Sequence, residues 1–151
     1  MKVPAGPNSP APARILLVDD NKMGLSARRS LLEELGHRAT IASSGEEALG
    51  YFAPAKFDLV ITDYKMPKMN GVELIERVRK IEPAIPIILI SGYVETVGLH
   101  EKNTGADVVI PKSNNEVEHL VRSVTKLLRK QVPRKPPVAL KAQVKSKRKS
   151  V

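Results

Sequence analysis

Polar side chains able to take part in chemistry follow four separate apolar runs of the chain. They are Asp19, Asp20, Asp63, Ser91 and Lys112. A run such as Leu59-Val60-Ile61 has no alternation of wet and dry faces, so it fits a strand buried on both sides, as in a parallel sheet covered by helices. The carboxyl ends of parallel strands lie on one edge of the sheet, where open α/β sheets bind ligands. The five side chains are therefore expected to meet in one site.

The chemistry of such a site follows from its residue types. Three carboxylates brought together repel one another, and a divalent cation relieves the repulsion; hard oxygen ligands with room for water and a phosphate oxygen suit Mg²⁺. Ser91 can donate a hydrogen bond to a phosphoryl oxygen and Lys112 can neutralise another. A carboxylate in this setting can attack phosphorus and form an acyl phosphate, and Asp63 is the candidate nucleophile. The alternative that Asp63 only makes local turn hydrogen bonds stays open on these residues alone.

Five predicted strands alternate with helical patterns, which indicates a (βα)5 chain. The strands are expected at residues 14–18, 38–42, 59–63, 87–90 and 108–110. Right-handed crossovers favour a doubly wound, three-layer domain over a barrel, which would need eight units. The segment from Val94 to Thr104 has weak periodicity and contains Gly98, so its helix is predicted to be the most mobile element.

The other four helices carry start signals and apolar stripes. The first begins at Asn21 and is ended by Gly36, the second begins at Ser43-Ser44-Gly45-Glu46-Glu47, the third is capped by Asn70, and the last is capped by Asn114 or Asn115. Their inward-facing residues are predicted to be Met23, Ala27, Leu31 and Leu35; Ala48, Leu49 and Phe52; Val72, Ile75, Val78 and Ile81; and Val117, Leu120, Val121, Val124 and Leu128.

Composition excludes several classes of protein. The chain of 151 residues has no cysteine, which removes thiol nucleophiles, disulfides and cysteine-bound metals. Its three histidines, His37, His100 and His119, show no metal-ligand spacing. No apolar run approaches the roughly 20 residues of a membrane span, and the start does not look like a secretion signal, so a cytoplasmic protein is expected.

The net charge of +9 is unevenly distributed. Residues 14–130 hold 17 basic and 16 acidic residues, whereas residues 131–151 hold seven basic residues and no acid. Residues 1–13 are rich in proline and alanine. We expect a disordered leader over 1–13, one folded domain over 14–130 and a disordered basic tail over 131–151.

The motifs in their order resemble those of the receiver (CheY-like) domain of two-component response regulators, over about residues 14–130. They are Val18-Asp19-Asp20, Asp63 with Met66-Pro67 and Asn70-Gly71, Ser91-Gly92, and Gly105-Ala106-Asp107 followed by Lys112. The resemblance implies a flavodoxin-like fold with strand order 2-1-3-4-5. It also implies that a histidine kinase, a histidine phosphotransfer protein or a small phosphodonor phosphorylates Asp63. Mg²⁺ would be bound by Asp20, Asp63, the backbone carbonyl of Lys65, and Asp19 directly or through water.

Three positions depart from the family pattern. Proline usually follows the lysine, but here Pro111 precedes Lys112 and Ser113 follows it. An aromatic residue usually stands where this chain has Val109, which predicts a weaker or differently built switch with Tyr93 as the nearby aromatic. Lys65 borders the line of water attack, and we hypothesise that Lys65 and Tyr93 slow loss of the phosphoryl group.

Other functions remain open on the same residues. A haloacid-dehalogenase-like phosphatase needs a second aspartate where Lys65 stands, and there is no glycine-rich phosphate loop. No helix-turn-helix segment follows residue 130, which disfavours sequence-specific DNA binding. The main expectation is a single-domain response regulator that acts through another protein and catalyses only its own phosphorylation and dephosphorylation. The alternative is a phosphorylation-independent docking module, with nonspecific binding of nucleic acid or anionic lipid by the tail.

Overall fold

Five parallel strands form the centre of the protein, whose computed structural model describes residues 12–52, 54–92 and 98–131. The strands are β1 (Arg14–Val18), β2 (Arg38–Ala42), β3 (Leu59–Asp63), β4 (Ile87–Ser91) and β5 (Val108–Pro111), in the sheet order β2-β1-β3-β4-β5. All four neighbouring pairs are parallel. The predicted doubly wound fold and its strand order are confirmed.

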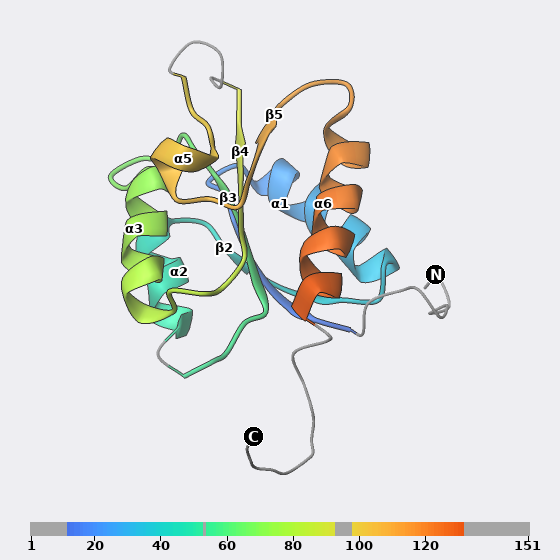
Figure 1. Ribbon diagram of the computed structural model, residues 1–151, viewed down its shortest axis with the longest axis horizontal. Coiled ribbons are helices and arrows are strands. Elements are labelled where there is room, and N and C mark those ends of the chain that lie inside the picture. The colour runs from blue at the N-terminus through green and yellow to red at the C-terminus, as the bar shows by residue number, and fades with distance from the viewer. Residues whose placement is uncertain (1–11, 53, 93–97, 132–151) are drawn as a thin grey trace.

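Helices cover both faces of this sheet. The described helices are α1 (Lys22–Glu34), α2 (Gly45–Phe52), α3 (Gly71–Ile81), α5 (Glu101–Thr104) and α6 (Glu116–Gln131). Figure 1 shows α2, α3 and α5 on one side of the sheet and α1 and α6 on the other. The protein is therefore a three-layer sandwich, and the carboxyl ends of all its strands lie along one edge.

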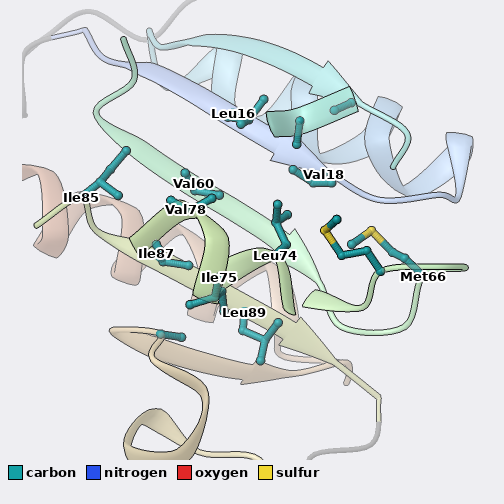
Figure 2. Close-up of a cluster of buried hydrophobic side chains, with 14 of the residues drawn as sticks. Leu16, Val18, Val60, Met66, Leu74, Ile75, Val78, Ile85, Ile87 and Leu89 are labelled. Atoms are coloured by element: carbon teal, nitrogen blue, oxygen red, sulfur yellow. The ribbon is translucent and has the colours of Figure 1, made fainter. Parts of the chain in front are cut away.

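Alternate residues of the central strands enter two separate cores. On β1, Leu16 and Val18 belong to one apolar cluster while Ile15 and Leu17 belong to the other. In the first cluster, strand residues such as Leu89 lie against Leu74, Ile75 and Val78 of α3 (Figure 2). In the second, the strands pack against α1 and α6. Both faces of β3 and β4 are thus buried, which explains their uninterrupted apolar sequences.

The predicted start signals of the first and third helices are present as local contacts. The Asn21 side chain accepts hydrogen bonds from the N–H groups of Met23 and Gly24, which caps α1. Asn70 forms a capping box with Glu73 at the start of α3. Gly36 has a φ of +95°, a left-handed conformation that suits glycine where α1 ends.

Four residues predicted to face inward are exposed, and they are Met23, Ala27, Ile81 and Val117. Met23 is 83% exposed, Ile81 is 51% exposed and Val117 is 58% exposed. The prediction for α1 was wrong because it followed apolar residues at four-residue spacing and passed over Arg28. Leu25, Arg28 and Leu32 form the buried face of α1 instead. Ile81 and Val117 lie at helix ends, where the sheet no longer covers the stripe.

The folded domain begins slightly earlier than predicted. Ala13 is buried, its N–H donates to Nδ1 of His37 over 3.0 Å, and its carbonyl accepts from Arg38. Residues 1–11 and 132–151, which were predicted to be disordered, lie outside the described residues. Residues 93–97 of the segment predicted to be mobile lie outside them too. Within the described ranges, no helix is long and apolar enough to span a membrane.

Candidate functional site

The structure brings the predicted site residues to the carboxyl edge of the sheet. Asp63 ends β3, Ser91 ends β4, and Asp19 and Lys112 follow β1 and β5. A cleft of about 660 Å³ opens there; its lining comprises Asp19, Asp20, Asn21, Asp63, Lys65, Met66, Pro67, Gly92 and Lys112. Ser91 itself is buried, and its neighbour Gly92 reaches the cleft.

The three carboxylates form a cluster. Asp19, Asp20 and Asp63 each place one oxygen within 4.8 Å of the others. Asp19 and Asp63 are buried, with 1% and 3% exposure, while Asp20 is exposed to the cleft. Such a set of hard oxygen ligands, partly open to solvent, matches the preference of Mg²⁺.

Asp63 is the most constrained member of the cluster. Its Oδ1 lies 2.8 Å from Nζ of Lys112, an ion pair whose lysine side chain is 41% exposed. That same oxygen is buried, and no donor among the described residues meets it in good hydrogen-bond geometry. Burial raises the pKa of Asp63, the charge of Asp19 raises it further, and the nearby ammonium group of Lys112 only partly opposes this. A buried anionic oxygen lacking a well-directed donor, beside two more carboxylates, fits a site for a divalent cation.

Lys112 reaches Asp63 although Pro111 precedes it. Pro111 is in register with Ser91 at the ends of β5 and β4, and the N–H of Lys112 donates to the Ser91 carbonyl over 3.0 Å. This bond fixes the backbone of Lys112 as the strand ends. The pairing of β5 with β4 therefore positions Lys112. The described residues contain no cis peptide bond.

The loop after β3 lines the cleft next to the three carboxylates. The N–H of Tyr64 donates to the Ile90 carbonyl, and the N–H of Gly71 donates to the Tyr64 carbonyl over 2.7 Å. A Cβ atom on Gly71 would overlap the carbonyl oxygen of Asp63. Gly71 therefore lets α3 approach the end of β3 closely.

Arg28 joins the cluster from α1, and its part in the site was not predicted from the sequence. Its Nη1 donates to Oδ2 of Asp19 over 2.7 Å, and its Nε and Nη2 reach Oε2 of Glu116 at 3.0 and 2.8 Å. Gly24 makes room for the pair, since a Cβ there would lie 2.9 Å from Asp19 Oδ2 and 3.4 Å from Nη1 of Arg28. The sequence shows a glycine four residues before Arg28 in the first turn of α1, but this spacing does not by itself identify a buried charge.

The predicted switch positions are placed only in part. Val109 is buried in the cluster under α3, and its N–H donates to Oε2 of Glu101 over 3.1 Å. Lys65 is exposed and lines the cleft. Tyr93 lies outside the described residues, so its predicted part in switching and phosphoryl retention stays a prediction.

Fold and site together define a doubly wound α/β domain with an acidic, lysine-bearing cleft at the carboxyl edge of its sheet. The sequence model of the response regulator receiver domain matches residues 15–125. The chain belongs to this family, whose members are the receiver domains of two-component response regulators.

Known relatives share this fold and sequence. A receiver domain protein (CheY-like) of Methanospirillum hungatei is 32% identical, with a TM-score of 0.73 over 82% of this chain and 98% of that chain. The response regulator protein TrrA of Thermotoga maritima, solved in complex with Mg(2+)-BeF, is 35% identical, with a TM-score of 0.68 over 76% of this chain and 97% of that chain. A response regulator receiver protein of Anaeromyxobacter sp. is 34% identical over 66% of this chain and 42% of its own length. The chain spans less than half the length of the first curated relatives it matches.

Proposed function

We propose that the chain is a phosphoryl-accepting switch of a two-component phosphorelay, with Asp63 as the acceptor. The observation that carries this proposal is the environment of the Asp63 carboxylate. It is buried at the end of β3, paired with Lys112 at 2.8 Å, and grouped with Asp19 and Asp20 around one cleft. The solved relative in complex with Mg(2+)-BeF supports a divalent cation at this kind of site.

The proposed reaction transfers one phosphoryl group. A carboxylate oxygen of Asp63 attacks phosphorus of a phosphohistidine, an oxygen–phosphorus bond forms, and the phosphorus–nitrogen bond breaks. The imidazole leaves with the electron pair and takes up a proton, and Asp63 becomes an acyl phosphate. Hydrolysis by water returns the carboxylate and releases inorganic phosphate.

Each remaining residue of the cleft has a proposed role. Asp20, Asp63, the backbone carbonyl of Lys65, and Asp19 directly or through water would hold Mg²⁺, which when bound offsets charge on the phosphoryl oxygens. Lys112 would pair with one phosphoryl oxygen, and the Ser91 hydroxyl would donate to another. Ser91 is buried, and its neighbour Gly92 lines the cleft, which supports this role.

The proposed partners follow from this chemistry. A histidine kinase or a histidine phosphotransfer protein supplies the phosphoryl group, and a downstream effector protein recognises the phosphorylated form. Phosphorylation would shift a pre-existing equilibrium of the surface near β5 and its flanking helices, so the output is made by protein contacts. With Val109 in place of an aromatic residue, ring rotation on β5 cannot be part of this switch.

Intact-mass analysis after incubation with acetyl phosphate tests the proposal. The native chain should gain the mass of one phosphoryl group when Mg²⁺ is present and much less when the cation is chelated. Asp63→Asn should gain none. The matched control is Asp107→Asn, which removes a carboxylate at the start of β5, away from the cleft, and should be phosphorylated as the native chain is.

Phosphorylation of Asp63→Asn to the native extent would overturn the proposal. The role of Lys65 and Tyr93 is tested separately, by replacing both with alanine and timing the loss of the phosphoryl group. We expect faster loss, and an unchanged rate would contradict that role.

A further inference from the structure

Arg28 is a buried cation that connects the acidic cleft to the start of α6. Only 8% of the residue is exposed, although arginine is rarely buried. On one side it bonds Asp19, which follows β1, and on the other it bonds Glu116, the first residue of α6. Asp19 and Glu116 thus bond different nitrogens of a single guanidinium group.

The charge of Arg28 belongs to the electrostatics of the cleft. Burial lowers the pKa of Arg28, but the hydrogen bonds and charges of Glu116 and Asp19 more than offset this, so its pKa is raised above the ordinary value and it stays charged. Counted with Lys112, it sets two positive charges against the three carboxylates. Because Arg28 also pairs with Glu116, the cluster keeps an excess of negative charge.

Arg28 also decides which carboxylate oxygens are available. Oδ2 of Asp19 accepts from Arg28, and Oδ1 of Asp19 accepts from the N–H of Asn21 over 3.0 Å. Oδ1 of Asp63 is paired with Nζ of Lys112 at 2.8 Å, although not in good hydrogen-bond geometry. A cation entering the cleft finds the exposed Asp20 less committed than Asp19.

We propose that Arg28 is a positioning residue that sets the affinity of the cleft for divalent cations, and that Glu116 opposes its effect. The proposal rests on the cation site of the proposed function. Arg28 holds Asp19 and repels the incoming cation, so it weakens binding. Glu116 offsets the positive charge of Arg28 from the α6 side, so it strengthens binding.

Two substitutions should therefore change affinity in opposite directions. Arg28→Met removes the competing charge and keeps most of the side-chain volume, and it should lower the Kd for Mg²⁺ by about tenfold. Glu116→Gln removes the negative charge that offsets Arg28, and it should raise the Kd by about threefold. Arg28→Lys keeps the charge but cannot reproduce all three nitrogen contacts, so its Kd should lie between those of the native chain and Arg28→Met.

The measurement is calorimetric titration of the full chain with Mg²⁺ at constant ionic strength. A merely structural role for Arg28 predicts lower stability of Arg28→Met with no gain in affinity. An equal or weaker affinity of folded Arg28→Met would overturn the proposal, as would tighter binding by Glu116→Gln. If Arg28→Met does not fold, Glu116→Gln decides alone, because its side chain is partly exposed and nearly isosteric with the native one.

One set of titrations separates the cation site from the role of Arg28. A native chain that binds no Mg²⁺ contradicts the cation site, and the role of Arg28 with it. Binding by the native chain with the same affinity in Arg28→Met contradicts the role of Arg28 alone.

Discussion

The predicted phosphoacceptor should lower the stability of the domain, so Asp63→Asn should stabilise it. The carboxylate is 3% exposed, and its Oδ1 has no well-directed donor among the described residues. An asparagine side chain in its place would have nearly the same shape and no charge. The substitution would also remove the repulsion between residue 63 and Asp19, which contributes to the raised pKa of the native carboxyl group.

The size of the effect can be worked from these contacts. A buried polar atom without a hydrogen bond costs about 1–3 kcal/mol. The ion pair with Lys112, whose side chain is 41% exposed, returns at most about 1 kcal/mol. We therefore expect Asp63→Asn to raise the free energy of unfolding by about 1–2 kcal/mol, or the Tm by about 3–6 °C.

The gain should depend on pH in a defined direction. Because the pKa of Asp63 is higher in the folded than in the unfolded chain, the folded state binds the proton more readily. Below the ordinary carboxyl pKa of about 3.9 both states are protonated and the native penalty is absent. As pH rises through the higher folded pKa the penalty develops, so the gain of Asp63→Asn is full near neutral pH and shrinks on acidification.

Urea unfolding followed by circular dichroism, without divalent cations, measures this difference. The matched control is Asp20→Asn in the same cluster, which is exposed and should change stability by less than about 0.5 kcal/mol. Added Mg²⁺ should stabilise the native chain and leave Asp63→Asn nearly unchanged. If Asp63→Asn is no more stable than the native chain at neutral pH, the reasoning about the buried oxygen is wrong.

Three further predictions concern the scaffold of the site. Burial lowers the pKa of His37, so the folded domain resists its protonation. The free energy of unfolding should therefore be highest above the unfolded pKa of about 6.5 and should fall as the pH drops below it. His37→Gln should remove this part of the pH dependence in urea unfolding curves. Gly71→Ala should lower the free energy of unfolding by about 2–4 kcal/mol, because its Cβ would overlap the Asp63 carbonyl oxygen. The control Gly50→Ala, whose Cβ would have nothing within 4 Å, should leave it unchanged or raise it by up to about 1 kcal/mol. Equal effects of the two substitutions would contradict the close approach of α3 to β3. Arg79→Met should lower the urea midpoint by an amount equal to about 2 kcal/mol, since Arg79 bonds the carbonyls of residues 83, 85 and 105, and a change within error would show that these bonds contribute nothing.

The strands and their order were accessible from sequence because each strand is short, apolar and closed by a polar residue. The run before Asp63 shows this, since the residues of β3 are buried on both faces of the sheet and need no alternating pattern. Parallel topology then brings every strand end to one edge. Ser91 and Lys112 were placed beside Asp63 by this rule alone, although 28 and 49 positions separate them from it in sequence.

The inward face of α1 could not be read in the same way. Apolar spacing favoured Met23, which is exposed, and excluded Arg28, which is buried. A buried arginine depends on acidic partners that are distant in sequence, and Glu116 is 88 positions away. No local pattern reveals that a charge will be neutralised across two elements, so this contact had to come from the fold.

The bond between Arg28 and Glu116 also limits how pieces of this domain can be exchanged. If Arg28 is replaced by an apolar residue, both Glu116 and the buried Asp19 lose their cation, and a buried charge without a partner costs several kcal/mol. Chimaeras with a relative that join α1 of one protein to α6 of the other should fold poorly when only one parent carries the pair. Exchanging both helices together should restore folding, so during divergence the two positions are expected to change as a unit.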